Sequence, residues 1–283
     1  MKIAIVGAGT VGTAVAVRWR DAGHTITAVS GREATSVRAA RWLPGVDVVS
    51  LADVPAGADV LVLAVPDDAV PEVVASLAGR IEPGSSALHL SGSLGLDALA
   101  PLEAAGVRTL AVHPLQTFAD VEGAIEALPG AAIAVTARDD GGTALGDQLA
   151  RDLGGRPFRL ADEDRPLYHV AAVFASNYLV TVSGAALDLF AAAGVADVAD
   201  AMHPLQAATL ANVHRLGPQQ ALTGPAVRGD AGTIARNLDA VAAASPALVP
   251  AYVALCRAAM DVAGSRLPDD RRRAIEEVLD RWR

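Results

Sequence analysis

The chain has almost no lysine: Lys2 is the only one in its 283 residues. It stands before the first predicted strand, far from any site that later residues could build. Lysine is therefore excluded as a group that gives or takes a proton in such a site. This task falls to histidine, tyrosine, serine or a carboxylate.

Cysteine and clusters of basic residues are also scarce. Cys256 is the only cysteine, so no internal disulfide can form, and we expect a buried thiol in a reducing compartment. The formal net charge is −9 and no run of lysine or arginine opposes it, which argues against nonspecific binding to nucleic acid. The histidines lack the spacing of a metal site, so we predict no metal. Small-molecule chemistry is the favoured class.

An uninterrupted apolar run long enough to span a membrane is missing too. The apolar residues after Met1-Lys2 are broken by a glycine triad and double as a strand, so they do not predict a signal peptide. Residues 167–193 are mostly apolar, but His169, Ser176 and Asn177 interrupt them too often for a lipid-facing span. We expect a cytoplasmic protein in which 167–193 form the buried central helix of a second domain.

The glycine triad has the pattern of a dinucleotide-binding turn. Residues 2–6 form a predicted strand that runs into G-x-G-x-x-G and an alanine- and valine-rich helix. The first glycine permits a tight turn, the second lets a pyrophosphate approach the backbone, and the third lets the helix pack against the strand. The N–H groups of the first helical turn would face the phosphates. The predicted contacts are Gly7, Gly9, Thr10, Val11 and Gly12.

The residues after the second predicted strand indicate which dinucleotide binds. Enzymes that use NAD place Asp or Glu there for the ribose 2′-OH, whereas this chain has Ser30-Gly31-Arg32, with Arg38 further on. A 2′-phosphate would meet a hydroxyl and a guanidinium rather than a repelling carboxylate. We predict NADP as the cofactor. The alternative is that Arg32 and Arg38 are solvated surface charges.

The pattern of apolar residues predicts two domains. Short apolar runs alternate with amphipathic helical stretches up to residue 161, which is typical of a doubly wound parallel sheet. After the acidic segment 161–166 the strand signals stop and helical periodicity continues to the end. We predict an α/β Rossmann domain over 1–161 and an all-α domain over 162–283. The predicted strands are 2–6, 25–29, 47–49, 60–65, 86–90, 109–112 and 131–135, with 157–160 at an edge, and the later helices are 197–202, 205–215, 230–244, 246–265 and 268–282.

Polar residues follow several predicted strands, and the carboxyl ends of such strands line one crevice. His113 would be held rigidly at a strand end, where it could exchange a proton with a substrate oxygen or nitrogen. The alternative is a structural cap fixed by Pro114. Around it we predict cofactor contacts at Val65, Pro66 and Ser91 and substrate contacts at Ser93 and Gln116.

Two later segments carry further candidates. On the predicted long helix, His169, Ser176 and Asn177 recur at i, i+7 and i+8 and would point together into the cleft, unless they form an interhelix hydrogen-bond network. Segment 223–230 is a loop rich in glycine and proline in which Asp230 can cap the next helix. Arg228 has no obvious partner there, and a guanidinium held by a loop can bind a substrate carboxylate through two hydrogen bonds.

Four motifs sharpen this prediction into a resemblance. They are Ser91-Gly92-Ser93, His113-Pro114-Leu115-Gln116, His169-x-x-Ala172-x-x-x-Ser176-Asn177 and Val227-Arg228-Gly229-Asp230. Their order and rough spacing resemble prephenate dehydrogenase, and the domain order is similar to that of 6-phosphogluconate dehydrogenase, pyrroline-5-carboxylate reductase and ketopantoate reductase. Over nearly its full length the chain most resembles a bacterial family in which a Rossmann-like domain is joined to a helical domain of unknown function. Prephenate dehydrogenase has His-Asp and Ser-His where this chain has His169-Val170 and Ser176-Asn177, so its substrate does not carry over.

The resemblance implies an NADPH-dependent oxidoreductase that acts on a small carboxylate-bearing oxo or imino compound. Ketopantoate-like reduction and prephenate- or arogenate-like dehydrogenation are the two reaction classes. Several related reductases donate the proton from a lysine, which this chain cannot do, so His113 or a residue of the long helix would take that part. The alternative is a non-catalytic NADP-binding or nucleotide-sensing protein, because a fold does not fix a function. The apolar helices predict a homodimer.

Overall fold

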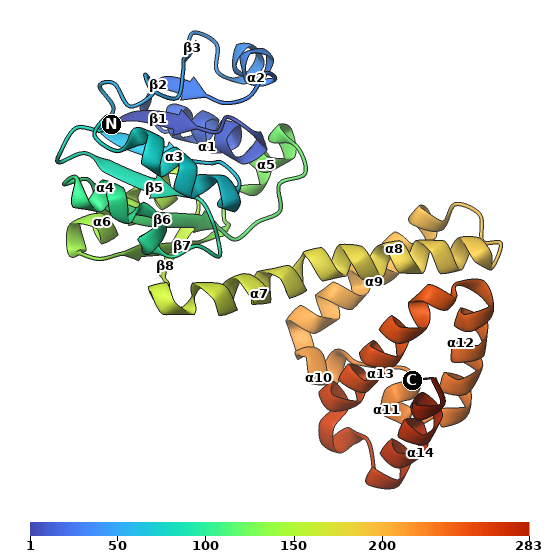
Figure 1. Cartoon of the computed structure of the whole chain (residues 1–283). Coiled ribbons are helices and arrows are strands. Elements are labelled where there is room, and N and C mark those ends of the chain that lie inside the picture. The colour runs from blue at the N-terminus through green and yellow to red at the C-terminus, as the bar shows by residue number, and fades with distance from the viewer. Residues whose placement is uncertain (283) are drawn as a thin grey trace. The chain divides into compact units, whose positions relative to one another are not determined.

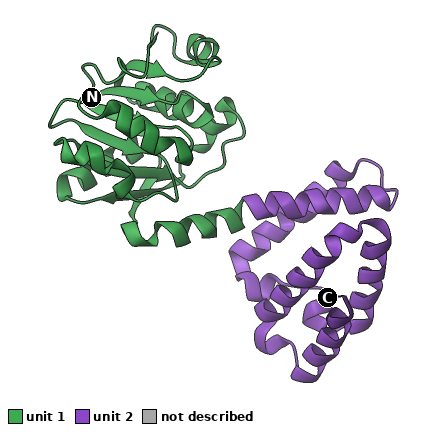
Figure 2. Cartoon of the chain, in the orientation of Figure 1, with its two compact units in different colours: residues 1–176 green, residues 177–283 purple. Residues whose placement is uncertain are grey.

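The structure is a computed structural model that describes residues 1–282. The chain forms two compact units, which divide between Ser176 and Asn177 (Figure 2). Unit 1 contains every strand, and unit 2 is built of helices. The predicted fold class, a Rossmann domain followed by an all-α domain, is confirmed.

Unit 1 is built on one eight-stranded sheet with the order β3-β2-β1-β4-β5-β6-β7-β8 (Figure 1). All eight predicted strands are present, and the last one lies at an edge as predicted. The apolar runs located them because strands covered on both faces read as nearly continuous hydrophobic segments. The bounds are β1 Lys2–Val6, β2 Thr25–Ser30, β3 Asp47–Val48, β4 Val60–Leu63, β5 Ser86–His89, β6 Arg108–Pro114, β7 Ala132–Ala137 and β8 Arg156–Arg159.

Most of the sheet is parallel, but β7 runs antiparallel to β6. The segment between these strands carries α5 (Val121–Ala127) and returns beside the end of β6, where Ile133 pairs with Pro114. β7 therefore runs back along β6, and β8 follows β7 in parallel. The carboxyl ends of β1, β2, β4, β5 and β6 lie along the same side of the sheet, as predicted, whereas β7 and β8 have their carboxyl ends on the opposite side.

Helices cover both faces of the sheet because successive residues of a strand point to opposite sides. Ile3 and Ile5 pack on one face with Trp19 and Leu149, whereas Ala4 packs on the other. The first face is covered by α1 (Thr10–Asp21), α5 and α6 (Asp140–Asp152), and the second by α3 (Val70–Leu77) and α4 (Ala100–Ala104). A further helix, α2 (Thr35–Trp42), follows β2. Both faces of the sheet are thus covered by apolar cores.

The predicted buried helix over 167–193 is wrong. Two helices, α7 (Arg165–Ala175) and α8 (Asn177–Ala192), meet at Ser176, whose ψ of −69° and φ of −124° are not helical. Only Arg165 is buried, while Leu167 is 74% and Val180 71% exposed. The apolar composition had indicated a core helix, but the chain by itself does not cover these faces. The units also divide after α7 rather than near residue 161, because Arg165 and Tyr168 bond to groups of unit 1.

Unit 2 has a core of its own. Ile234, Leu238, Met260, Ile275 and Leu279 are fully buried within it, and Cys256 is buried as predicted. The two helices predicted over 197–202 and 205–215 form one helix with Pro204 inside it. Its helices beyond α8 are α9 Val198–Leu216, α10 Pro218–Ala221, α11 Pro225–Arg228, α12 Ala231–Ala244, α13 Val249–Ala263 and α14 Asp269–Leu279.

Two stretches of the described chain, Asp162–Ala192 and Pro246–Arg266, are long and apolar enough to cross a membrane by length and composition alone. Core helices of proteins outside membranes have the same two properties, so this is weak evidence for a span. The first stretch is moreover broken at Ser176.

Candidate cofactor pocket and histidine site

The glycine triad has the geometry that its pattern predicts. Gly7 has a φ of 94°, in the region that favours glycine, and a Cβ there would lie 2.6 Å from the Ala64 carbonyl oxygen. A Cβ on Gly12 would lie 2.2 Å from the Gly7 carbonyl oxygen, so the third glycine permits the close packing of helix and turn. Gly9, by contrast, faces open space. The middle glycine thus leaves its backbone free for a ligand.

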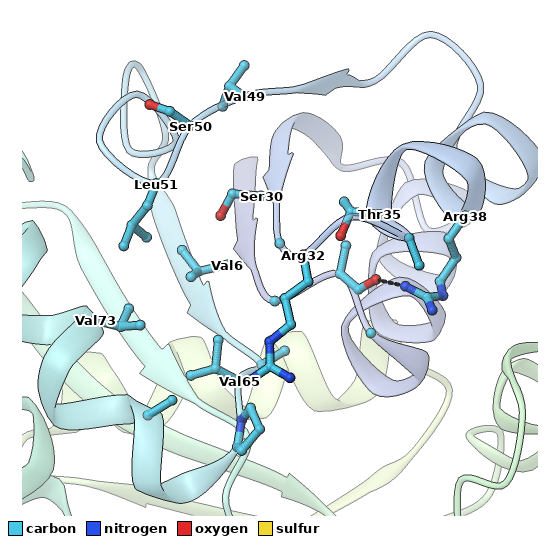
Figure 3. A pocket seen from close by; sticks show the side chains of 18 residues that line it. Val6, Ser30, Arg32, Thr35, Arg38, Val49, Ser50, Leu51, Val65 and Val73 are labelled. Carbon is cyan, nitrogen blue, oxygen red and sulfur yellow. Dashed lines mark hydrogen bonds between the residues drawn. The ribbon is translucent and has the colours of Figure 1, made fainter.

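A cavity of about 610 Å³ opens beside this turn (Figure 3). Its wall comes from the carboxyl ends of β1, β2 and β4, the start of α2 and the segment after β3. The described residues that line it include no aspartate or glutamate. They are Val6, Gly7, Ala8, Gly9, Ser30, Gly31, Arg32, Ala34, Thr35, Arg38, Val49, Ser50, Leu51, Ala64, Val65, Pro66, Ala69 and Val73. Ser30, Arg32, Val65 and Pro66 therefore lie where a nucleotide site was predicted, next to the glycine turn.

The two arginines of the cavity are placed differently. Arg38 donates a hydrogen bond of 2.6 Å to the Ala8 carbonyl oxygen and so braces the glycine turn. Arg32 is exposed, and its side chain extends into the pocket towards Val65 (Figure 3). Arg32 is thus the better placed of the two to meet a phosphate group.

A carboxylate joins the cavity to a second cluster at the same sheet edge. Asp67 follows Pro66 and accepts hydrogen bonds from Ser91 Oγ at 2.7 Å and Ser93 Oγ at 2.6 Å. Ser91 Oγ also accepts from the backbone N–H groups of Ser93 and Leu94. The segment after β5 is therefore fixed to the segment after β4 by its serines. Both predicted serine contacts lie in this cluster.

His113 lies at the end of β6 with one ring nitrogen engaged. Its Nδ1 is 2.8 Å from the Tyr168 hydroxyl oxygen, and the two rings meet edge to face at 88° with centroids 5.5 Å apart. Tyr168 belongs to α7, so this helix holds the imidazole from one side. The free nitrogen, Nε2, faces the backbone of Gly92, where a Cβ would lie only 2.8 Å away. The ring is therefore held by one nitrogen and presents the other.

His169 approaches the same spot from α7. A Cβ on Gly92 would lie 2.9 Å from its Nδ1, an atom that is buried and has no hydrogen-bond partner. A buried imidazole nitrogen without a partner among the described residues is energetically costly, so this atom is a notable feature of the site. The prediction that His169 accompanies His113 is consistent with this arrangement. Gly92 therefore lets both imidazole nitrogens approach the same stretch of backbone.

A buried guanidinium sets the charge of this cluster. Arg165 is fully buried and donates to the carbonyl oxygens of Ser91 and Leu94 and to Thr136 Oγ1. Burial, and next the positive charge of Arg165, lowers the pKa of His113 to about 4. The same two causes lower the pKa of His89, whose ring is fully buried, to about 4. Both imidazoles are neutral near pH 7.

The structure separates some of the other predicted residues. His169, Ser176 and Asn177 do not share one helical face, because Ser176 ends α7 and Asn177 begins α8 in the other unit. The side-chain amide of Gln116 donates a hydrogen bond to the Ala127 carbonyl oxygen and accepts one from the Thr117 N–H.

The predicted loop over 223–230 contains the single-turn helix α11, at whose end Arg228 is exposed. Asp230 caps α12 by accepting from the Thr233 N–H at 2.9 Å, as predicted. Arg228 is thus held between a short helix and a capped one.

The sequence analysis missed four residues of the site, which are Asp67, His89, Tyr168 and Arg165. Tyr168 directly precedes His169, but the sequence analysis considered only residues that share one helical face with His169, and Tyr168 is not among them. Arg165 lies in the acidic segment 161–166 at the predicted domain boundary, and a sequence does not show that a charged side chain will be buried against distant carbonyl groups. His89 and Asp67 follow or end strands, and that position was the available signal.

Two family models match the chain. A Rossmann-like domain model matches residues 1–114, and the model of a domain of unknown function (DUF2520) matches residues 131–259. No curated protein sequence matches the chain.

Several solved structures share the fold over almost the whole chain. A candidate NADP oxidoreductase from Bacteroides fragilis has 25% sequence identity and a TM-score of 0.80, covering 92% of this chain and 98% of that chain. An imine reductase from Myxococcus stipitatus, in complex with NADP+, has 16% identity and a TM-score of 0.68, covering 100% and 99%. A pyrroline carboxylate reductase from Plasmodium falciparum with NADP bound has 13% identity and a TM-score of 0.60, covering 93% and 98%. The chain therefore has the fold of NAD(P)-dependent oxidoreductases.

Proposed function

Because the chain joins a Rossmann-like domain to a DUF2520 domain, we propose that it is an NADPH-dependent oxidoreductase that acts on a small carboxylate-bearing oxo or imino compound. One observation carries the proposal. The cavity beside the glycine turn and the histidine cluster lie at the same edge of the sheet, and Asp67 links them. A protein that only bound a nucleotide would need the cavity alone.

The cavity fits NADP on the evidence of its own residues. Gly9 leaves the backbone open to a pyrophosphate, Arg32 supplies a cation, and no described carboxylate lines the wall to repel a 2′-phosphate. The oxidoreductases of Bacteroides fragilis and Myxococcus stipitatus, which are linked to NADP by name or by bound ligand, support the same cofactor. When bound, NADPH would supply the hydride, and the chain would supply orientation, charge and a proton.

His113 is the residue that we assign to proton exchange. Its Nε2 is presented at the strand end while Tyr168 holds its Nδ1, so the imidazole has one defined orientation. His169, whose Nδ1 also lies beside Gly92, would help to orient the substrate. Ser91 and Ser93 would keep the backbone around Gly92 in place through their bonds to Asp67.

Arg228 is the candidate for binding a substrate carboxylate. Its side chain is exposed and forms no hydrogen bond with the residues that the structure describes, so the guanidinium is available. A planar guanidinium matches a carboxylate through two parallel hydrogen bonds, which also orient the substrate.

We also propose a homodimer formed through unit 2. Large apolar side chains of α8 and α9 are exposed in the single chain, among them Val180 at 71%, Leu205 at 61% and Leu210 at 51%. Exposed large apolar side chains in such number are typical of a protein–protein interface. Light scattering at micromolar concentration tests the proposal: a mass of two chains is expected, and a monomer would contradict it.

The oxidoreductase proposal is tested by following NADPH oxidation in the presence of a panel of 2-oxo acids and cyclic imines. At least one compound should be turned over by the wild-type protein and much more slowly by His113→Ala. Tight NADPH binding without turnover of any compound would favour a nucleotide sensor instead.

A further inference from the structure

The contact between His113 and Tyr168 has a preferred direction. A phenol is a stronger hydrogen-bond donor than acceptor, and an unprotonated imidazole nitrogen is a strong acceptor. Because His113 is neutral near pH 7, one of its two nitrogens carries no proton. The 2.8 Å contact is therefore best made by the Tyr168 O–H donating to Nδ1. In a neutral ring the remaining proton then resides on Nε2, the nitrogen that faces Gly92.

We propose that Tyr168 and His113 form a proton relay, in which Nε2 gives its proton to the substrate while Nδ1 takes the proton of the Tyr168 hydroxyl. This inference rests on the proposed function, because it concerns the proton that accompanies reduction of the substrate. It adds the source of that proton, and it assigns Tyr168, which contacts His113 rather than the substrate, as a positioning and relay residue.

The relay solves a chemical problem of the site. A neutral imidazole that lost its Nε2 proton alone would become an imidazolate, which is a very unstable anion near neutral pH. If Nδ1 gains a proton in the same step, the imidazole stays neutral and only changes tautomer. The chain contains no lysine near the site that could donate the proton instead, since Lys2 is its only lysine.

The step balances in atoms and electrons. The substrate carbon gains a hydride from NADPH, which is oxidised to NADP+, and the electron pair of the C=O or C=N bond moves to the heteroatom. That atom takes the Nε2 proton, the N–H bond at Nε2 breaks, and a new N–H bond forms at Nδ1. The O–H bond of Tyr168 breaks, and the resulting phenolate later takes a proton from water.

The surroundings of Tyr168 act on this step in two opposite directions. Burial raises the pKa of its hydroxyl to about 12 and keeps it protonated until the step occurs, whereas the nearby charge of Arg165 partly offsets this by favouring the phenolate. Tyr168 is only half-buried, so water can return the proton. The groups that act on the charge of His113 are Arg165, His169, Asp67 and His89. Asp67 favours a protonated His113, but the other three oppose it, so a cationic imidazole is not the form that the site supports.

The first test needs no substrate. Nitrogen-15 NMR of the cofactor-free protein near neutral pH distinguishes a protonated from an unprotonated ring nitrogen, and His113→Gln identifies the signals of His113. We expect the proton on Nε2 in the wild type and a mixture of tautomers in Tyr168→Phe. Tyr252→Phe is the matched control, because it also removes one hydroxyl with a single hydrogen bond, to Asn237 at 3.0 Å in unit 2. A proton on Nδ1 in the wild type would overturn the relay.

The second test uses a turned-over substrate. The rate of the chemical step is measured under single-turnover conditions in mixtures of H2O and D2O, where two moving protons give a curved dependence on the deuterium fraction and one gives a straight line. We expect a curve for the wild type and for Tyr252→Phe. For Tyr168→Phe we expect a straight line and a rate lower by about tenfold to a hundredfold, in the range of general acid–base effects.

The outcomes separate the two proposals. Turnover with a straight line for the wild type, or with an unchanged rate in Tyr168→Phe, would overturn the relay and leave the oxidoreductase proposal intact. Absence of turnover with every compound would overturn both. A purely structural role of Tyr168 would lower the stability of Tyr168→Phe but would leave the curvature and the tautomer unchanged.

Discussion

Gly92 is the residue whose substitution most directly probes the geometry of the histidine cluster. A Cβ at this position would lie 2.8 Å from His113 Nε2 and 2.9 Å from His169 Nδ1. The shorter distance is about 0.6 Å less than the 3.4 Å at which ordinary van der Waals contact begins. His113 cannot retreat freely, because its Nδ1 is bonded to Tyr168. Gly92→Ala must therefore displace one or both imidazoles.

The expected effect follows from that displacement. A shift of about 1 Å in a reacting group can cost on the order of a hundredfold in rate, so a shift of half that size should lower kcat by about tenfold. Overpacking should cost about 1–3 kcal/mol of stability. NADPH affinity should change little, because Gly92 does not line the cavity. The assay is NADPH oxidation at saturating substrate, with calorimetric titration of NADPH and denaturant unfolding of each variant.

Gly232→Ala in α12 is the matched control, because its Cβ would meet nothing closer than 3.6 Å. The control should retain wild-type kcat. The reasoning would be refuted if Gly92→Ala kept wild-type kcat in a folded protein, since the histidine nitrogens would then not need the space above Gly92.

Three further predictions concern the cofactor cavity, the proposed substrate-binding residues and buried His89. NADPH should bind at least about tenfold tighter than NADH, or roughly 1.4 kcal/mol, and Arg32→Ala should remove most of that difference, so equal affinities in titrations of the wild type would contradict it. His113→Ala should lower kcat by about a hundredfold or more and leave the NADPH affinity nearly unchanged. Arg228→Ala should chiefly raise KM, and Arg228→Lys should restore KM only in part. A lower melting temperature with unchanged kinetics in both alanine variants would mean that both residues are structural. The pKa of buried His89 is lowered from 6.5 to about 4, so the neutral ring's contribution to the free energy of unfolding is complete above pH 6.5 and is lost as the pH falls towards 4. His89→Leu should therefore flatten the dependence of the free energy of unfolding on pH in this range. An unchanged slope in this variant would contradict the prediction.

The sequence predicts those features that depend on local patterns. Strand positions follow from apolar runs. The glycine turn follows from Gly7, whose positive φ favours glycine, and from Gly12, where a Cβ would lie 2.2 Å from the Gly7 carbonyl oxygen. His113 was identified because it ends a strand, and this placement is fixed by the strand itself.

Features set by tertiary contacts escaped prediction. The direction of β7 depends on where the chain returns to the sheet after α5, and no single residue encodes it. The break at Ser176 divides a run whose composition favours one continuous helix. Arg165 is buried because carbonyl oxygens of Ser91 and Leu94, far away in sequence, accept its hydrogen bonds. The proposed role of Tyr168 depends on its contact with His113, which the sequence alone does not show.

The central claim is that this chain moves a hydride from NADPH to a substrate at the edge of the sheet in unit 1. The most direct measurement uses NADPH that carries deuterium at the transferable position of the nicotinamide and follows the products of the 2-oxo acid and cyclic imine panel by mass spectrometry. We predict a product that carries one deuterium on the reduced carbon, formed by the wild type and at least about a hundredfold more slowly by His113→Ala. NADPH that binds in the cavity while no product acquires deuterium would contradict the account.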